Sequence, residues 1–453
     1  MAITKKLHKL TITEAASLIS AGKLLPSELV DSCLERIEAL DDKIKAWALV
    51  DREGALEAAS RLEQELRRGK PRGRLHGIPI GIKDIFYTAG LRTEAGSRAW
   101  SGFVPTYDAT TVARLKEAGA IILGKTHTTE GAYFDPAPTH NPWNIAHTPG
   151  GSSAGSGAAV AADMCLAALG SQTGGSTLRP AAFNGVVGFK AEYGRISTYG
   201  VVALAWTLDH VGILTHTVED AAIIFQAIAG HDPRDPRSLN APVPDCLTSL
   251  DGQKAPRLGL VRQYFYERAD EEMCNHTDSV VEILKQAGAR VKEVALPPDF
   301  RATRTISSTV VAVEALVYHQ EMFIKNEDKY GPRMRQLMEI GGSTPATEYA
   351  RALQSRLQQR AEIEPLLHEF DALITPGAPG IAPRDLTTTG DPVMQRGWTV
   401  VGVPTISLPS GLSKEGLPLA IQLVGPPLAE DHLLAVARWC ERALEFNLRP
   451  PLD

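Results

Sequence analysis

Two Gly-Gly-Ser turns carry the residues of this sequence that are best suited to chemistry. They are Gly150-Gly151-Ser152 and Gly174-Gly175-Ser176. Paired glycines let the backbone turn tightly and leave peptide N–H groups without partners. A serine at the end of such a turn can act as a nucleophile with an oxyanion hole already beside it. The chemistry would be acyl transfer, and it requires a second group that takes the proton of the serine.

Lys83 is the candidate for that second group. It lies in the apolar stretch Leu75–Phe86, which has the pattern of a β-strand. Burial disfavours a charged ammonium, and a base that works near neutral pH needs a pKa of about 7–8 rather than about 10.4. A neutral Lys83 could take a proton from Ser176 directly or through Ser152. The alternative is structural, in which Lys83 reaches solvent or pairs with Asp84.

A second motif suggests a nucleotide site. Gly119–Thr126 fits the P-loop pattern GxxxxGK[ST]. The four middle residues are Ala-Ile-Ile-Leu, which favour a strand rather than a flexible phosphate-binding turn. No acidic strand end stands out as a Mg²⁺ ligand, so a plain buried strand is the preferred interpretation.

A third motif suggests an α/β-hydrolase. Gly151–Gly155 fits GxSxG, with Ser153 as the nucleophile and His210 or His368 as the possible partner. The nucleophile elbow requires a strand directly before it. The preceding residues, Asn144–Pro149, instead have the composition of a loop.

Predicted strands and helices alternate along the chain, which indicates an α/β fold with a largely covered sheet. A Pro-rich stretch, Asp232–Ala255, is the best candidate for a linker or surface excursion. Strands are expected at Leu75–Phe86, Ala120–Lys125, Cys165–Gly170, Val186–Lys190, Asp209–Leu214, Arg257–Val261, Phe370–Pro376, Pro404–Gly411 and Leu417–Pro426. Helices are expected from Thr11 and from Pro26, and at Gly54–Arg68, Asp108–Ala118, Ala154–Ala162, Thr217–Ala229, Ala269–Ala287, Ser308–Asn326, Thr347–Phe370 and Glu430–Leu444.

Composition narrows the function classes. The 453 residues carry a net charge of −6 and no basic block, so nucleic acid and anionic membranes are not expected as partners. The start, Met1–Lys6, is not followed by the apolar region of a signal peptide. The five cysteines are far apart and the histidines lack ligand spacing, which predicts no disulfide, no metal and a reducing cytosol. We therefore expect a cytoplasmic protein without a cofactor.

Four stretches in this order resemble the amidase signature family. They are Gly77–Asp84, Gly150–Ser156, Thr173–Ser176 and the segment from Asp209 to Ala221, and Ser152 and Ser176 are 24 positions apart, as in that family. Several specific motifs in the family's order outweigh the P-loop and elbow patterns, which we interpret as coincidences.

The resemblance implies a Ser-cisSer-Lys triad. Ser176 would be the acyl nucleophile, and Ser152, after a cis peptide bond from Gly151, would relay protons. Lys83 would act as the base and then as the acid for the leaving amine. The N–H groups of Thr173, Gly174, Gly175 and Ser176 would form the oxyanion hole. Family members hydrolyse amides in two steps through an acyl-enzyme, without metal or cofactor.

The resemblance also implies the architecture. One domain over residues 1–453 would hold a twisted mixed sheet between helical layers. The signature core would span about 70–220, and 232–346 would form a variable region on the substrate side.

The sequence departs from the commonest family pattern at two positions near the triad. Residue 172 is Gln where many members have Asp, and Arg179 stands three residues after the nucleophile rather than two. Thr126–Phe134 corresponds to the usual pocket wall, so Tyr133 and Phe134 either line the acyl pocket or pack in the core.

The predicted function is a cytosolic serine amidohydrolase that cleaves a small amide, anilide or carbamate-like C–N bond, with a homodimer as a candidate assembly. The alternative is the glutamine-amidase A-type component of a tRNA-dependent amidotransferase complex. Against it, Asp391–Trp398 does not resemble the glutamine-binding segment of that component, and the chain is somewhat short. A catalytically dead scaffold is disfavoured by the complete triad.

Overall fold

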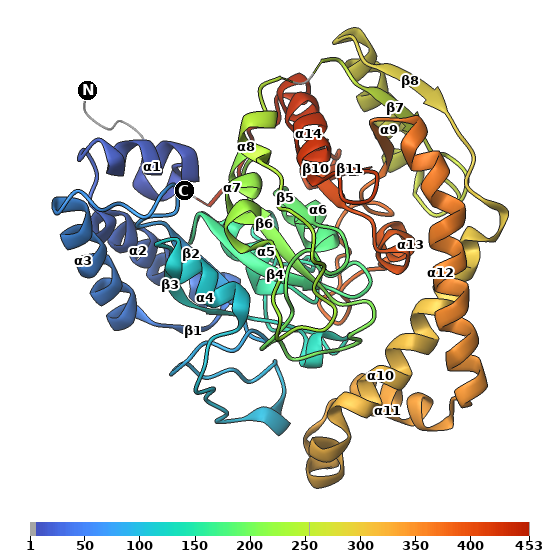
Figure 1. Cartoon of the computed structure of the whole chain (residues 1–453), viewed down its shortest axis with the longest axis horizontal. Helices are drawn as coiled ribbons and strands as arrows, with labels where there is room; N and C mark the ends of the chain where they lie inside the picture. The colour runs from blue at the N-terminus through green and yellow to red at the C-terminus, as the bar shows by residue number, and fades with distance from the viewer. Residues whose placement is uncertain (1–5, 253, 453) are drawn as a thin grey trace.

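One eleven-stranded sheet runs through the molecule, with helices on both faces (Figure 1). The computed structural model describes residues 6–252 and 254–452. The strands follow the order β1-β3-β2-β4-β6-β5-β10-β11-β9-β7-β8. They are β1 (Trp47–Val50), β2 (Pro79–Lys83), β3 (Ile121–Thr126), β4 (Ala167–Gln172), β5 (Val187–Lys190), β6 (His210–Thr215), β7 (Arg257–Leu260), β8 (Arg290–Glu293), β9 (Ala372–Pro376), β10 (Thr405–Leu412) and β11 (Pro418–Val424).

The pairing makes the sheet mixed, as predicted. The neighbours β3-β2-β4 and β9-β7-β8 are parallel, and the remaining pairs are antiparallel. The helices are α1 (Ile12–Ser20), α2 (Pro26–Ile44), α3 (Arg52–Arg67), α4 (Thr110–Glu117), α5 (Ala154–Ala161), α6 (Leu178–Asn184), α7 (Val218–Ile228), α8 (Cys246–Ser249), α9 (Glu271–Gln286), α10 (Thr303–Asn326), α11 (Pro332–Ser343), α12 (Ala346–Glu369), α13 (Val393–Val401) and α14 (Glu430–Leu444).

Glycines on one face of the central strands let two turns lie directly on the sheet. A Cβ at Gly212 of β6 would overlap the Thr177 hydroxyl, and one at Gly170 of β4 would stand 2.7 Å from the Ser153 hydroxyl. No larger side chain fits at either position without moving the turns. The sequence thereby places both Gly-Gly-Ser turns against the centre of the sheet.

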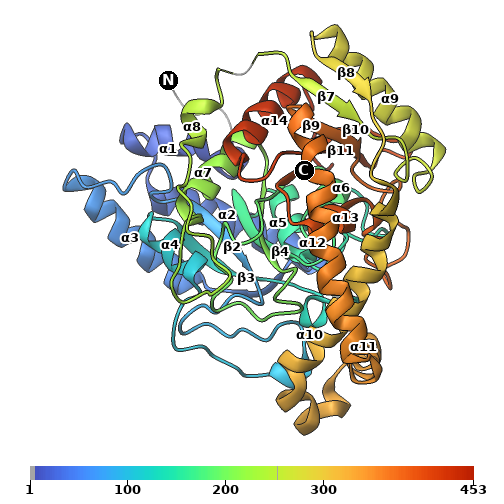
Figure 2. The same ribbon diagram turned by 45° about the vertical axis from the view of Figure 1, so that its right-hand side comes forward.

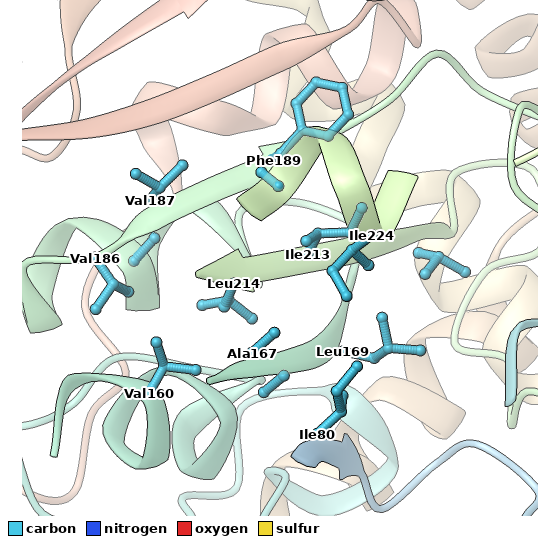
Figure 3. Close-up of a cluster of buried hydrophobic side chains, with 14 of the residues drawn as sticks. Ile80, Val160, Ala167, Leu169, Val186, Val187, Phe189, Ile213, Leu214 and Ile224 are labelled. Carbon is cyan, nitrogen blue, oxygen red and sulfur yellow. The ribbon is translucent and has the colours of Figure 1, made fainter. Parts of the chain in front are cut away.

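The opposite face of these strands packs on α7. The rings of Phe189 in β5 and Phe225 in α7 meet edge to face with centroids 5.5 Å apart. Figure 3 shows Phe189, Ile213 and Ile224 in this apolar layer. In the same view, Val160 of α5 lies next to the strand that carries Ala167. The strands that carry the candidate catalytic residues are therefore buried on both sides, which holds their ends in place.

Three long helices form a separate region beside the sheet. Helices α11 and α12 both pack on α10, and α10 also contacts α13. Figure 2 brings this group forward, with α10, α11 and α12 lying together. Its first two helices lie in the C-terminal part of the stretch 232–346, which the resemblance implies to be variable, and the group supplies one wall of the cavity in front of Ser176.

Several elements differ from the predicted ones. Helix α13 lies where the sequence analysis predicts neither a helix nor a strand, and α10 begins at Thr303 rather than Ser308. The sequence analysis also missed β1, β8, α6 and α11. Helix α6 contains Pro180, which is typical of a helix break, but this proline is in the first turn, where its missing N–H has no intrahelical partner to lose. The Pro-rich stretch is mostly irregular and contains the short α8, and its residue 253 is outside the described part.

Three further observations concern the exclusions made from composition. In residues 6–252 and 254–452, no helix is long and apolar enough to cross a membrane. The same residues contain no group of three or more His, Cys, Asp or Glu placed to hold a metal ion. All five cysteines are free thiols. Residues 1–5, on which the expectation of no signal peptide partly rests, are outside the described residues.

Candidate active site

Lys83 is fully buried at the end of β2, and its amine contacts two serines. Its Nζ donates to Ser152 Oγ at 2.7 Å and to Ser171 Oγ at 2.8 Å. Parallel pairing of β2 with β4 places Lys83 and Ser171 at the same edge of the sheet. Burial lowers the pKa of Lys83 well below its ordinary value, while the charge of Asp209 opposes the shift. The shift is towards the neutral amine, which is the form that a base requires.

Asp84, the predicted structural partner of Lys83, pairs with a different lysine. Asp84 Oδ1 lies 3.4 Å from Lys125 Nζ, and Asp84 Oδ2 accepts a hydrogen bond from the backbone N–H of Glu94 at 3.0 Å. Lys125 is the lysine of the P-loop pattern, and it lies in the buried strand β3 with its amine also bound to the Phe86 carbonyl at 2.7 Å. The strand interpretation of that pattern is confirmed.

Ser152 and Ser153 occupy the loop before α5. The peptide bond between Gly151 and Ser152 is cis, as the resemblance implied. Ser153 Oγ contacts the backbone of Ser171 at 3.2–3.3 Å and does not cap the helix, although Ser153 stands at its N-cap position. The residues before Ser153 are irregular, and neither candidate histidine contacts it, since His210 bonds the Leu208 carbonyl and His368 lies near Glu364. The elbow geometry is therefore absent from the described chain.

Ser176 ends the second Gly-Gly-Ser turn and faces a cavity. It is partly exposed, and its backbone carbonyl accepts the N–H of Ser153 at 3.2 Å, which holds the two turns together beside Ser152. The four N–H groups from Thr173 to Ser176 donate to no other described residue. Free N–H groups beside a serine hydroxyl can stabilise an oxyanion.

Two side chains that the sequence analysis did not assign to the site fix this turn. Gln172 Oε1 accepts the N–H groups of Thr177 at 2.9 Å and Leu178 at 3.0 Å. Asp209 accepts the Thr173 hydroxyl and the N–H of Leu204 at 2.9 Å. Burial raises the pKa of Asp209 to about 6, and the Thr173 hydrogen bond lowers it. The amide of Gln172 thus orders the turn where many family members have Asp.

The cavity in front of Ser176 has a volume of about 320 Å³, which is the size of a small-ligand site. One side is the turn from Thr173 to Ser176. Tyr133 and Phe134 also line the cavity, and Tyr133 packs against the hydrophobic core as well. The opposite wall comes from α10 and α11, with Val311 and Ile340 among its apolar residues. Three arginines line the cavity as well, Arg179, Arg304 and Arg396.

Ser171 is the site residue that sequence reasoning missed and that lies nearest the base. A neutral amine has two N–H groups and one lone pair, so while one N–H donates to Ser171 the hydrogen bond with Ser152 can reverse, with the Ser152 hydroxyl donating to the lone pair. The only sequence signal is its place at the end of the strand that leads into the second turn. We regard Ser171 as a positioning residue.

Replacing Ser171 by alanine is expected to lower kcat/KM by roughly ten- to a hundredfold, because Lys83 loses the acceptor that orients it. Loss of an acceptor destabilises the ammonium more than the amine, so the rising limb of the pH–rate profile should move to lower pH. Ser171→Thr keeps the hydroxyl and should recover most of the rate. A Ser171→Ala profile with an unmoved limb would argue against the orienting role.

Comparison with known proteins gives consistent results. The family model described as Amidase matches residues 28–434. The chain is 36% identical to a protein of Geobacter sp. (strain M21) that is named as the A-type component of glutamyl-tRNA(Gln) amidotransferase, over 98% of this chain and 99% of the relative. It resembles a solved structure titled as that of an amidase, with 32% identity, TM-score 0.86, and 96% and 100% of the two chains covered. It also resembles the native peptide amidase from Stenotrophomonas maltophilia, with 29% identity, TM-score 0.88, and 98% and 99% covered.

Proposed function

The chain belongs to the amidase family of C–N hydrolases, and from that premise we propose that it cleaves an amide bond through an acyl-enzyme on Ser176. The observation that carries the proposal is the contact of a fully buried Lys83 with the hydroxyl of Ser152 at 2.7 Å, in the loop bonded to the Ser176 turn. A buried amine that bonds two hydroxyls rather than a carboxylate has no evident structural use, and it supplies the base that a serine nucleophile needs.

In the proposed mechanism, the protons move along one line of residues. Ser176 Oγ attacks the amide carbonyl carbon while its proton passes to Ser152, whose own proton passes to Lys83. The N–H groups of the turn from Thr173 to Ser176 bind the negative oxygen of the tetrahedral intermediate. The ammonium of Lys83 then returns the proton through Ser152 to the leaving nitrogen, so the C–N bond breaks and the amine departs. Water attacks the ester by the same proton path and restores Ser176.

Two physiological roles share this chemistry. The cavity of about 320 Å³ suits hydrolysis of a small free amide. The second role, supported by the names of the curated relatives, is that of the ammonia-releasing A-type component of a tRNA-dependent amidotransferase. These relatives favour the second role over the first. The described cavity wall favours the first, because it offers no acidic side chain to the ammonium of a free glutamine.

Release of ammonia or amine from a panel of amides, anilides, carbamates and ureas tests the proposed chemistry. A fluorophosphonate probe should inhibit the purified protein, and mass spectrometry should place the label on Ser176. A label on Ser153 would restore the elbow interpretation. Labelling at neither serine, together with no hydrolysis of any panel member, would count against the proposal.

Purification of the tagged chain from its own host separates the two roles. The amidotransferase role predicts a stoichiometric second protein and glutaminase activity that depends on it. The free amidase role predicts a chain that purifies alone, as a monomer or homodimer, with full activity.

A further inference from the structure

A threonine of α13 holds the peptide bond between Gly174 and Gly175 from outside the cavity. Thr399 is fully buried, and its hydroxyl donates to the Gly174 carbonyl, with the two oxygens 2.7 Å apart. The Gln395 carbonyl, one helical turn earlier, is a second acceptor for this hydroxyl at 3.1 Å. A threonine hydroxyl has a single proton, so the shorter contact is the stronger bond. Thr399 therefore fixes one carbonyl of the turn that carries Ser176.

Gln172 determines which way the Thr399 hydroxyl points. Gln172 Nε2 donates to Thr399 Oγ1 at 3.1 Å, and an oxygen that accepts this bond turns its own proton away from Gln172 and towards a carbonyl. The other end of the same amide, Oε1, accepts the N–H groups of Thr177 and Leu178. One side-chain amide thus joins α13 to the start of α6. An aspartate, which many family members have at position 172, has no N–H group to donate.

Fixing a carbonyl also fixes the N–H group of the same peptide unit. In a trans peptide the C=O and the following N–H point in opposite directions, and the only cis bond in the described chain is that between Gly151 and Ser152. Because α13 holds the Gly174 carbonyl, the N–H of Gly175 points away from Thr399. Gly174 and Gly175 both line the cavity in front of Ser176. The Gly175 N–H is one of the groups proposed above to bind the oxyanion.

A reversed peptide would be sterically easy and would find a partner. Both residues that flank the bond are glycines, which adopt the required backbone angles without a Cβ clash. Gln395 Oε1 is buried without a hydrogen-bond partner among the described residues, and it lies 2.9 Å from the position that a Cβ at Gly175 would occupy. In the reversed state the Gly175 N–H would turn towards this acceptor. The Gly174 carbonyl would then turn away from α13, and the oxyanion would lose a donor.

We propose that Thr399 is a positioning residue that holds the oxyanion hole in its competent state, with Gln172 directing the Thr399 hydroxyl. The inference rests on the proposed function, because it assigns the Gly175 N–H to the oxyanion of an intermediate formed on Ser176. Thr399 is not among the described residues that line the cavity, so it acts on the substrate only through the turn. Negative charge develops on the substrate oxygen in the transition state, so Thr399 contributes to kcat rather than to ground-state binding.

Thr399→Val keeps the shape of the side chain and removes the donor. For the best substrate of the amide panel, kcat should fall by roughly 10²-fold, the usual effect of losing one oxyanion donor, while KM changes by less than about threefold. Phenylboronic acid forms a tetrahedral adduct with a nucleophilic serine, and its Ki should rise by at least about tenfold. Thr399→Ser keeps the hydroxyl and should have a kcat within about threefold of the natural value.

Thr277→Val is the matched control. Thr277 is also a buried helical threonine whose hydroxyl bonds the carbonyl four residues earlier, that of Met273 at 2.8 Å, but it lies in α9 and does not line the cavity. This variant should keep the kcat and KM of the natural sequence. Equal losses of kcat in Thr277→Val and Thr399→Val overturn the proposal, as does a Thr399→Val effect confined to KM.

Gln172→Glu tests the same arrangement with Thr399 in place, and it decides the matter if Thr399→Val does not fold. The carboxylate still accepts the N–H groups of Thr177 and Leu178, but it accepts the Thr399 proton as well, so the Gly174 carbonyl loses its donor. We expect kcat to fall by at least about tenfold. An unchanged kcat would overturn the directing role of Gln172.

Crystal structures of the natural and Thr399→Val proteins separate this inference from the proposed chemistry. The inference predicts that the Gly174 carbonyl bonds Thr399 in the first structure and is reversed, or divided between two orientations, in the second. Reversal in a protein whose natural form hydrolyses no amide supports the positioning role of Thr399 and counts against the proposed function. Hydrolysis that depends on Ser176, together with an unmoved carbonyl in the variant, supports the proposed function and overturns the inference.

Discussion

Replacing Ser176 by alanine is expected to lower kcat on any amide substrate by at least ~10⁴-fold while leaving the fold intact, because the hydroxyl that would form the acyl intermediate is lost. The loss is large because a nucleophile acts together with its base, and either one alone is nearly ineffective. The hydroxyl of Ser176 has no hydrogen-bond partner among the described residues, so its removal leaves no buried group unsatisfied. Ammonia release and circular dichroism measure the two outcomes.

The control for Ser176→Ala is Ser279→Ala, on the exposed side of α9, which should keep the rate of the natural sequence. Normal hydrolysis by the Ser176→Ala protein would reject the mechanism. A collapse of the circular dichroism signal would instead assign the turn a structural role, and fluorophosphonate labelling of the natural protein would then decide between the two.

Lys83→Met is the second substitution for which we expect a large effect. It should lower the activity and raise the stability. The rate should fall by at least ~10³-fold because Ser152 loses its proton acceptor. The natural protein should show a kcat/KM that rises with pH through the lowered pKa of Lys83, since only the neutral amine accepts a proton. The variant should lose this rising limb.

The expected change in stability follows from the lowered pKa of Lys83 in the folded protein. In the unfolded chain Lys83 has its ordinary pKa near 10.4, so at neutral pH the unfolded state binds a proton that the folded state disfavours. The free energy of unfolding contributed by this residue therefore rises with pH between the folded and the unfolded pKa. Methionine removes the cost of burying the amine, so the melting temperature near pH 7 should rise and its pH dependence should weaken.

Lys190→Met is the matched control for this experiment. Lys190 is also fully buried, and burial lowers its pKa to about 7, but its amine bonds the carbonyls of Val403 and Ala191 away from the cavity. That variant should keep the rising limb of the rate profile. Loss of the limb in both variants, or an unchanged limb in Lys83→Met, would remove Lys83 from the role of base.

The sequence was most informative where burying a residue of that type is energetically costly unless the residue has a function. A lysine within an apolar strand and two glycine-flanked serines led to Lys83, Ser152 and Ser176, and the structure brings Lys83 and Ser152 into contact. The sheet was predictable for a similar reason, because the buried strands are apolar and separated by turn residues. Helix α13 was not, because its apolar and β-branched residues, such as Val400, fit a strand or loop equally well, and packing decides its state.

The residues that sequence reasoning missed are those whose partners in the site are distant from them in the sequence. Ser171 matters because parallel pairing brings the end of β4 beside Lys83, and Asp209 because β6 returns antiparallel next to it. Arg396 and Arg304 lie more than 120 positions from Ser176 along the chain, so no local pattern joins them to it. Arg179 was noted as a departure from the family pattern, but its unused donors become visible only in three dimensions.

The two sides of the cavity come from different parts of the chain, and this division has an evolutionary consequence. The proposed reacting groups lie between residues 83 and 176 in strands and turns that pack tightly on the sheet, whereas α10 and α11 contribute side chains from 304 to 340. Mutations in the second part can alter which molecules are accepted without disturbing the groups that cleave them. A lineage with this architecture can therefore acquire new substrates by drift and selection in two helices, and directed evolution of this enzyme should begin with a library confined to α10 and α11.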